Sequence, residues 1–374
     1  MPNDFPRQTL GPFTNLARSV DGDLDSYVSA NYFALTTDKG VVAKTISAIE
    51  NYGTSLLTGH ASFQIPEHSL LEEVLAEICQ QETCCITSSG YTANLVALSV
   101  LASSSRDLVI FDEHIHHSIR AGAQLAGATT DFFPHNDCEA LKSKLATVRS
   151  QYRRVIIATE GVYSAEGTFG NVVGLSELAI QYDCTLLIDE CHSLGIAAPG
   201  RGILGKVPIP ATTRTLIIGS LGKSFASSGG LVAGPSKLIN KIRSRSPIFL
   251  LTTGLTPATI VSALAAATKI KNDHNLHEQL SERIALFCEL ADTHELPLAE
   301  SKTNTPIFTV PVGKVVESWS TLVKKGFLVQ GLGFPAVPRN SERIRIMLNV
   351  AHTKKQITHL VEAIASLPTL AYKN

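Results

Sequence analysis

Short apolar runs alternate with helical patterns along most of this chain. Four runs rich in β-branched residues, each closed by polar or glycine residues, occupy 107–111, 154–161, 184–190 and 215–220. The stretches between them are long enough for helices, and the segment 71–78 places apolar residues at 71, 74, 75 and 78, the spacing of one helix face. Strands that are apolar on both faces are typical of a buried, mostly parallel sheet. The pattern therefore predicts an α/β fold with helices on both faces of the sheet.

Beyond residue 256 the pattern changes to two long helical segments followed by short strand-like pieces, among them TPIFTV and RIRIML. We therefore expect a large domain over 51–255 and a smaller C-terminal α+β domain over 256–374, joined at the turn signals of 252–257. Residues 1–50 show no sheet pattern, and we expect this N-terminal segment to pack with the C-terminal domain.

Composition narrows the class of protein. The 374 residues carry 32 Lys and Arg against 33 Asp and Glu, a net charge of −1, and 44% of them are hydrophobic. Without a basic block, the chain has no electrostatic reason to bind nucleic acid or an anionic membrane, and no run approaches the ~18 apolar residues of a membrane span. The seven cysteines lack a framework spacing, which indicates reduced thiols. Because the N-terminus also lacks a leader pattern, we expect a cytoplasmic protein.

The residues that could carry chemistry follow the apolar runs, where parallel sheets bind their ligands. Asp189 closes one run, and Lys223, flanked by glycine and small residues, follows the next. One interpretation is a structural ion pair. The other is a pyridoxal 5'-phosphate (PLP) site. There, a lysine with little side-chain cover suits Schiff-base chemistry, and a carboxylate held under the pyridine nitrogen is its usual partner.

A phosphate site and a stacking group for such a cofactor also have candidates. The turn SSGYTAN leads into a helical run, so we expect the amides of Gly90 and Tyr91 at a helix N-terminus, which favours an anion; an ordinary cap explains the same residues. His116 is a candidate to stack on a flat ring, and the alternatives are a surface histidine or a metal site with His114 and His117. We expect no metal, because no Cys or carboxylate stands at the spacing of a closed zinc site.

An ordered set of motifs resembles the α-oxoamine synthase family of fold-type-I PLP enzymes. The set spans about residues 29–365 and comprises SGYTAN, DEHIHHS, HND, TEGVYSAEG, DECHSLG, GRG, GSLGKSF, LTTGLTP, FPAVP and RIRI. The family includes 8-amino-7-oxononanoate synthase, glycine C-acetyltransferase, 5-aminolevulinate synthase, serine palmitoyltransferase and aminoketone-signal synthases. The resemblance implies a mostly parallel central sheet with helices on both faces and a smaller C-terminal α+β domain.

The resemblance also implies roles for individual residues around the PLP ring. Lys223 would bind the cofactor covalently, Asp189 would pair with the pyridinium nitrogen, and His192 would hydrogen-bond the phenolic oxygen. His116 would stack on the ring, and Ser164 would lie near the phenolic oxygen.

Further implied contacts concern the phosphate and the substrate. The amides of Gly90 and Tyr91 and the side chain of Ser220 would hold the phosphate, with Thr253 reaching in from a second subunit, so a homodimer with a shared active site is implied. Arg345 would bind the carboxylate of the amino acid, because a guanidinium grips both oxygens at once. The alternative for Arg345 is an ion pair with Glu342.

Two segments depart from the family pattern. The family's S-N-D-Y-L-G-L stands here as SANYFAL (29–35), so Ala30 replaces the asparagine that assists the substrate carboxylate; either Asn31 substitutes for it, or the amino-acid site differs. In 53–72 the usual glycine- and serine-rich run gives way to one containing Leu56, Leu57 and Phe63, which suggests a more apolar acyl pocket, although core packing explains these residues too.

The implied reaction joins a small amino acid to an acyl-CoA or acyl-carrier thioester, with decarboxylation in most relatives, and gives an α-aminoketone. 8-Amino-7-oxononanoate synthesis is the main hypothesis, with aminoketone-signal synthesis and glycine C-acetyl transfer as alternatives. The TEGVYS and RIRI motifs disfavour an aminotransferase or a Cys-β-lyase, and the presence of Lys223 disfavours a non-catalytic PLP-fold partner subunit.

Overall fold

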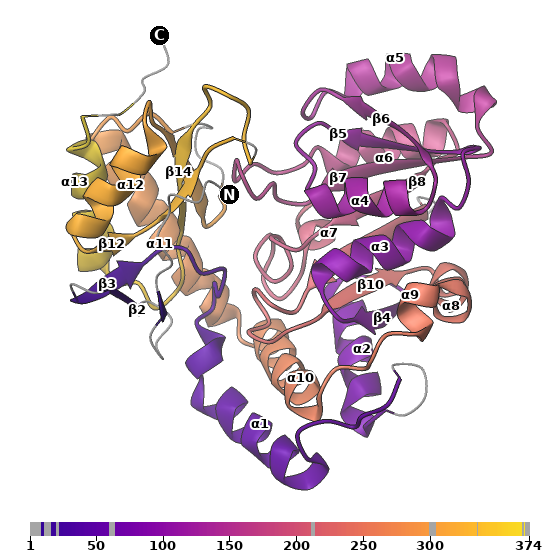
Figure 1. The fold of residues 1–374 in the computed structure, drawn as a ribbon, viewed down its shortest axis with the longest axis horizontal. Helices are drawn as coiled ribbons and strands as arrows, with labels where there is room; N and C mark the ends of the chain where they lie inside the picture. The colour runs from indigo at the N-terminus through magenta and orange to yellow at the C-terminus, as the bar shows by residue number, and fades with distance from the viewer. Residues whose placement is uncertain are drawn as a thin grey trace. The chain divides into compact units, whose positions relative to one another are not determined.

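The computed structural model describes residues 9–10, 16–19, 22–59, 64–210, 214–298, 304–334, 336–368 and 370. Contacts divide the chain into two compact units (Figure 1): a larger one of residues 39–163 and 169–274, and a smaller one of residues 1–38, 164–168 and 275–374. The boundary thus follows residue 274, whereas the sequence suggested 255. Residues 39–50 join the larger unit, because helix α1 (Lys39–Tyr52) packs on α10 (Pro257–Asn272).

A seven-stranded sheet forms the centre of the larger unit, in the order β4-β10-β9-β8-β7-β5-β6. Only β10 runs against its neighbours, so the other six strands point the same way. Four of them coincide with the predicted apolar runs. The strands are β4 (Thr83–Thr87), β5 (Asp107–Asp112), β6 (Thr129–Phe133), β7 (Arg154–Glu160), β8 (Thr185–Asp189), β9 (Arg214–Ser220) and β10 (Gly230–Gly234).

Helices cover both faces of this sheet. One apolar cluster joins α3 and α4 to alternate strand residues, including Ile156 and Leu187, while their neighbours Ile157 and Leu186 are equally buried and belong to the opposite face. The sheet is therefore buried on both sides, as its continuous apolar strands require. The remaining helices are α2 (Pro66–Ile78), α3 (Gly90–Leu101), α4 (His117–Leu125), α5 (Cys138–Val148), α6 (Val172–Gln181), α7 (Ile203–Lys206), α8 (Ser236–Arg245) and α9 (Pro247–Leu250), with a 3-10 turn at Arg149–Gln151.

The smaller unit contains two short sheets, ordered β1-β2-β3-β12 and β11-β14-β13. The N-terminal strands were not predicted: β3 pairs with β12, some 300 residues away in the sequence, in the register Asp25↔Phe327. The elements are β1 (Thr9–Leu10), β2 (Leu16–Ser19), β3 (Gly22–Ser26), β11 (Ile307–Pro311), β12 (Phe327–Leu328), β13 (Gln330–Leu332), β14 (Arg343–Met347), η1 (Leu35–Thr37), α11 (His274–Thr293), α12 (Val315–Lys324) and α13 (Lys354–Ala365).

Two general features bear on the predictions. None of the described helices has both the length and the hydropathy needed to cross a bilayer. All seven cysteines lie in the described part of the chain, and all are free thiols.

Candidate active site

Polar residues gather where the strands of the larger sheet end. Strands β5, β7, β8 and β9 close on Asp112, Glu160, Asp189 and Ser220. Because β10 is antiparallel to both β9 and β4, the end of β4 and the turn that follows it lie on the same edge. This carboxyl edge is where parallel sheets place ligands.

Asp189 is a buried carboxylate with both oxygens hydrogen-bonded. Its exposed fraction is 4%. Its Oδ1 accepts from the backbone N–H of Cys191 at 3.0 Å, and its Oδ2 accepts from Nδ2 of Asn94 at 2.7 Å. Asn94 lies in α3 with no exposed surface, and it also donates to Ser118 Oγ at 2.9 Å. The sequence analysis gave Asn94 no role, although a polar residue inside the apolar helix α3 is a signal for one.

The turn before α3 closely approaches Cys191 and Ser220. Ser89 caps the helix, since its Oγ accepts from the N–H of Thr92 at 3.0 Å. A Cβ on Gly90 would lie 2.9 Å from Cys191 Sγ and 3.1 Å from Ser220 Cβ, so glycine allows this approach. The first N–H groups of α3, those of Gly90 and Tyr91, have no partner within the helix. A helix N-terminus of this kind favours an anion, and this one lies beside Cys191 and Ser220.

Lys223 lies half-buried in a short closed loop between β9 and β10. The loop is held by bonds from Leu221 N to Gly229 O and from Ala226 N to Lys223 O, at 2.9 and 3.0 Å. The positive charge of Lys223 acts on the Cys191 thiol, which places the amine near the Asp189 turn. Among the described residues no hydrogen bond or ion pair to this amine is found, so the structural Asp189–Lys223 ion pair is not formed.

His116 is the N-cap of α4 and is exposed. Its Nδ1 lies 2.8 Å from Ser118 Oγ, and its backbone N–H donates to the buried Glu160 at 2.7 Å. The ring meets Tyr91 edge to face, with centroids 6.4 Å apart. His192, three residues after Asp189, is buried at 8% exposure.

From sequence, the metal alternative combined His114 with His116 and His117, three histidines of this edge. His114 instead groups with Asp112 and His135, whose potential ligand atoms lie within 4.8 Å of one another. His135 Nδ1 is 3.0 Å from Asp112 Oδ1, and the backbone N–H of Asn136 donates to Oδ2 at 2.8 Å. Burial raises the pKa of Asp112, but the bonds from His135, Asn136 and His114 outweigh it and lower that pKa below its usual value.

Glu190 is a second buried carboxylate, next to Asp189 in sequence. It has no exposed surface, and its Oε2 accepts from Ser193 Oγ at 2.9 Å and from the N–H of Ile203 at 2.6 Å. Its Oε1 is buried, and no described residue donates a hydrogen bond to it. Burial raises the pKa of Glu190 from 4.5 to about 7, against the lowering effect of its two hydrogen bonds.

Arg345 and Ser164 meet in the smaller unit. Arg345, on β14, donates from Nη1 to the carbonyl of Ser164 at 2.7 Å and from Nη2 to Gln330. Its Nε is buried and has no hydrogen-bond partner in the described part of the chain. Burial lowers the pKa of this guanidinium, which Tyr32 and Glu166 partly oppose. The alternative ion pair with Glu342 is not formed among the described residues.

Asn31 lies in the same unit and is committed to a turn. Its Oδ1 accepts from the N–H of Leu35 at 3.0 Å, and its Nδ2 donates to Thr36 Oγ1 at 2.7 Å. The side chain thus opens the turn η1, and both ends of its amide are engaged. The amide nitrogen keeps a second N–H besides the one given to Thr36, so Asn31 as a ligand of the substrate carboxylate stays a prediction.

Thr253 lies exposed in the larger unit, bridged to Gly59. The nearby Leu57 is 89% exposed, and the cavity that Leu56 and Leu57 line holds only about 10 Å³, too little for an acyl chain. Phe63, the third residue of the expected acyl pocket, lies outside the described residues.

Comparisons with known proteins cover almost the whole chain. Residues 30–364 match the family model described as aminotransferase class I and II. The chain is 35% identical to a putative 8-amino-7-oxononanoate synthase of Trichodesmium erythraeum, over 92% of this chain and 89% of the relative. It is 34% identical to 8-amino-7-oxononanoate synthase of Beijerinckia indica, over 93% and 89%. A serine palmitoyltransferase of S. paucimobilis with bound PLP shares the fold, with a TM-score of 0.90 at 23% sequence identity. The match covers 96% of this chain and 90% of that structure.

Proposed function

We propose that this chain, which belongs to the aminotransferase class I and II family and is a PLP-dependent acyltransferase of its α-oxoamine synthase branch, condenses a small amino acid with an acyl thioester to an α-aminoketone. One observation carries the residue assignment. A buried carboxylate with both oxygens bonded, a helix N-terminus and a lysine amine with no partner among the described residues lie at one edge of the larger sheet.

The residues at this edge fit PLP. The hydrogen bonds from Asn94 and Cys191 favour the charged form of Asp189, the form that pairs with a protonated pyridine nitrogen. The N–H groups of Gly90 and Tyr91, at the N-terminus of α3, are assigned to the phosphate. Ser220 lies next to Gly90, where its hydroxyl can add a hydrogen bond. His116, exposed beside Tyr91, is assigned to the ring face, and His192 to the phenolic oxygen. When bound, PLP supplies an electron sink for negative charge at the α-carbon of the amino acid.

The protein's own groups then bind, orient and move protons. Lys223 Nζ holds the cofactor and, once the amino acid has replaced it, is the base that removes the α-proton and later returns one. Arg345 is assigned to the substrate carboxylate. Its Nε has no partner among the described residues, and its Nη1 is bonded only to the uncharged carbonyl of Ser164, so the guanidinium can still donate hydrogen bonds to an anion. Attack on the thioester releases the thiol, and loss of the original carboxylate as CO₂ completes the aminoketone.

The substrate pair follows from the curated relatives, which are named 8-amino-7-oxononanoate synthases. We therefore assign alanine and a pimeloyl thioester as the leading pair. Thiol release is measured with alanine or glycine against pimeloyl-, acetyl- and longer acyl-CoA. Fastest turnover with alanine and pimeloyl-CoA supports the assignment. Preference for glycine with acetyl-CoA, or for a long chain, moves the protein to another activity of the branch, and no turnover with any pair favours a non-catalytic partner subunit.

The cofactor assignment is tested separately by absorption. The purified protein is expected to take up PLP and show the visible band of a lysine-bound cofactor. Lys223→Ala is expected to lose that band, whereas Lys206→Ala, the nearest preceding lysine in the sequence, keeps it. A wild-type protein that stays colourless after PLP is added refutes the assignment.

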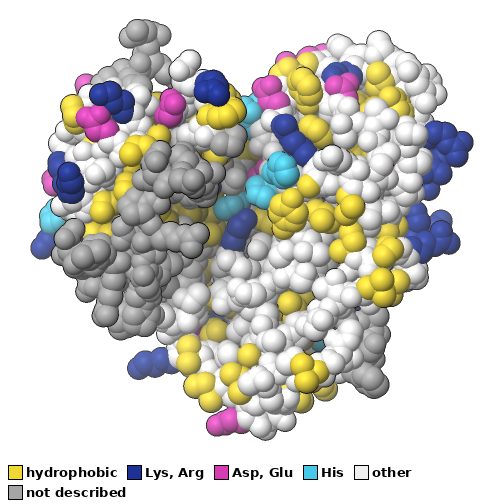
Figure 2. Space-filling view, in the orientation of Figure 1, with side chains coloured by type: hydrophobic (Ala, Val, Ile, Leu, Met, Phe, Trp, Pro, Cys, Tyr) yellow, Lys and Arg dark blue, Asp and Glu magenta, His cyan; other side chains and the backbone are white. Residues whose placement is uncertain are grey.

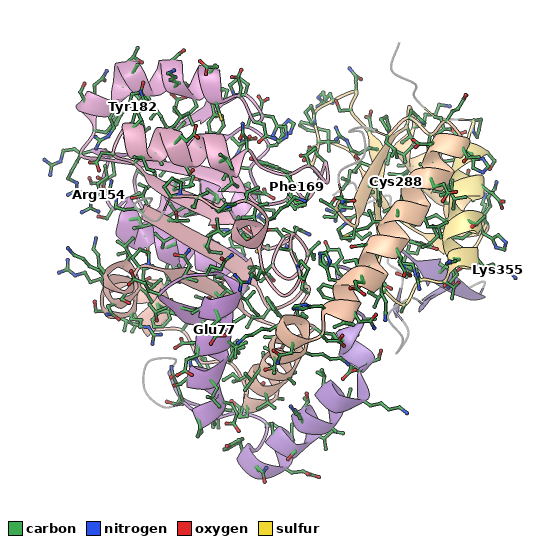
Figure 3. All side chains as sticks on the ribbon, turned by 180° about the vertical axis from the view of Figure 1, so that it is seen from behind. Glu77, Arg154, Phe169, Tyr182, Cys288 and Lys355 are labelled. Carbon is green, nitrogen blue, oxygen red and sulfur yellow. The ribbon has the colours of Figure 1, made fainter. Side chains whose placement is uncertain are left out.

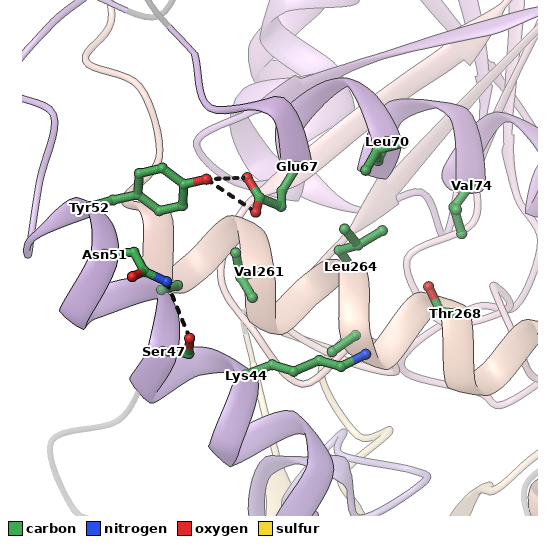
Figure 4. A pocket seen from close by; sticks show the side chains of 12 residues that line it. Lys44, Ser47, Asn51, Tyr52, Glu67, Leu70, Val74, Val261, Leu264 and Thr268 are labelled. Atoms are coloured by element: carbon green, nitrogen blue, oxygen red, sulfur yellow. Dashed lines mark hydrogen bonds between the residues drawn. The ribbon is translucent and has the colours of Figure 1, made fainter.

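A homodimer is part of the proposal. Leu57 and Leu251 are 89% and 85% exposed near Thr253, the residue assigned to the partner's cofactor site. Helix α1 adds a second exposed apolar stripe, Val42, Ile46 and Ile49, and Figure 2 shows hydrophobic side chains over α1 and α10. Helices α1, α2 and α10 also line a cavity of about 490 Å³, where the Tyr52 hydroxyl donates to Glu67 (Figure 4).

Leu251→Asp is expected to yield monomers in sedimentation, because it places a charge in an apolar contact.

We also propose a cytoplasmic location, supported by seven free cysteines, of which Cys79, Cys84 and Cys85 are buried.

A further inference from the structure

The larger unit has a second cavity at the opposite edge of its sheet. It holds about 420 Å³ and lies at the amino ends of β7, β8 and β9, where Arg154, Thr185 and Arg214 stand. Strands of five to seven residues separate this edge from Asp189 and Ser220, a distance of roughly 20 Å. It is therefore distinct from the candidate active site.

The lining of this cavity is strongly cationic. Arg and Lys side chains gather at the right-hand edge of the larger unit in Figure 2, and Figure 3 labels Arg154 and Tyr182 on the same edge. Asp183 is the only acid among the lining residues, in a chain whose net charge is −1. The cations are Arg149, Arg153, Arg154, Arg214, Lys237 and Lys241.

Structural roles account for part of this charge. Arg149 donates to the Tyr182 carbonyl at 2.6 Å and Arg154 to the Leu101 carbonyl at 3.0 Å, so each stabilises the C-terminal end of a helix. Arg153 forms two bonds, of 2.9 and 2.6 Å, with the fully buried Asp107.

Several donors are left over. Arg154 uses one nitrogen of its guanidinium, and Arg214 uses Nη2 for Asp183. Lys237 is exposed, and among the described residues no acceptor for its amine is found. Even when Asp107 and Asp183 are both counted against the six cations, an excess of positive charge remains in one concave site.

The cations also repel one another. The pKa of Lys241 is lowered, by burial first and then by the charges of Arg154, Arg245 and Arg153. Lys241 has one acceptor, the carbonyl of Val100 at 3.2 Å. An anion in the cavity would remove this repulsion, because it supplies the negative charge that the protein lacks there.

We propose that this cavity binds a nucleotide-type ligand, one that joins two or more phosphate groups to a flat ring. Guanidinium forks match phosphate oxygens in pairs, and only a multiply charged anion balances the excess. The volume lies in the range of small-molecule sites. The half-buried Leu238 supplies an apolar surface for the ring, with the buried Leu101, Val155 and Ile156 behind it. The assignment is independent of the reaction proposed above, since it uses none of that site's residues.

The test is equilibrium binding of ATP to the PLP-loaded protein. Lys237→Glu is expected to weaken binding at least tenfold, because it reverses a charge that forms no structural bond. Lys324→Glu, the same change at an exposed position on α12, is expected to leave the affinity unchanged. Lys237→Gln gives a milder version if the charge reversal perturbs folding, and an unchanged PLP spectrum verifies that it does not.

Titration with CoA distinguishes a free nucleotide from the nucleotide part of CoA as the ligand. If only the affinity for ATP depends on Lys237, the cavity binds a free nucleotide. If the affinity for CoA depends on Lys237 as well, the cavity binds the nucleotide part of CoA. Equal ATP affinity in the wild type and in Lys237→Glu overturns the proposal. So does ATP binding that CoA displaces in both proteins alike, which is the behaviour expected of the active site.

Discussion

The buried carboxylate of Glu190 has a direct consequence for stability. Its pKa is raised from 4.5 to about 7, and no surface of the side chain is exposed. Between these two pH values the unfolded chain has lost the proton and the folded protein keeps it, so stability falls as the pH rises from 4.5 to 7. At about 1.36 kcal/mol per pKa unit, the loss amounts to roughly 3 kcal/mol above pH 7.

Glu190→Gln is expected to remove this loss. Glutamine has the same shape, its Oε1 accepts from Ser193 and Ile203 as Oε2 does, and it carries no charge to desolvate. The variant and the wild type should melt at nearly the same temperature at pH 5. At pH 8 the variant should melt higher by roughly 5 °C, given about 2 °C per kcal/mol for a chain of this length.

Thermal melting of the two proteins from pH 5 to pH 8 measures this difference. Glu177→Gln, at an exposed glutamate of α6, is the control and should follow the wild type at every pH. A melting difference between Glu190→Gln and the wild type that is the same at pH 5 and pH 8 refutes the argument. A variant that is less stable at pH 8 would show instead that the hydrogen bonds of the charged form outweigh its burial.

Three further changes probe the site. Arg345→Ala should raise KM for the amino acid by about tenfold or more while the PLP band persists, since a charge-assisted bond contributes ~1.5–3 kcal/mol. The matched control is Arg343→Ala, because the guanidinium of Arg343 pairs with Glu166 at 3.7 Å. Loss of the PLP band in Arg345→Ala would contradict the role assigned to Arg345. Asn94→Leu should weaken PLP binding in a spectroscopic titration, because Asp189 loses a 2.7 Å donor, whereas Ser118→Ala keeps that donor and should bind normally. Gly230→Ala should weaken PLP binding as well, since its Cβ would stand 2.2 Å from the Ser89 carbonyl and displace the turn before α3; unchanged cofactor affinity would mean that the turn is not the phosphate site.

The four strands that the sequence revealed are buried on both faces and also form long β-branched runs. β5, β7, β8 and β9 are continuous apolar runs, and their identity needs no knowledge of their partners. β10, with the sequence GLVAG, begins and ends in glycine, and β6 is an edge strand that alternates in burial. Strands β2 and β3, LARS and GDLDS, contain few β-forming residues. They form because distant segments pair with them, and this information is not local.

The site divides in the same way. Asp189, Lys223 and the Gly90 turn were predicted because their residue types at strand ends point to one chemistry, and motif resemblance supplied the remaining predictions. Asn94 escaped notice because its function depends on a contact across 95 positions of sequence. Asn31 was one of two alternatives offered for the departure at Ala30, and its side chain also serves the backbone of its own turn, a local role that residue identity does not reveal.

The smaller unit is assembled from both ends of the chain, and this affects how the protein is made. The strand β3 emerges from the ribosome early but pairs with β12 only after the roughly 300 residues between the two strands have been synthesised. At ~5–20 residues per second, the N-terminal segment waits roughly 15 to 60 s for its partner. During that interval the larger unit has its complete sequence available, while the strand edge of β3 stays open. Nascent chains of this protein therefore expose an unpaired strand that chaperones, or other nascent chains, can reach before synthesis ends.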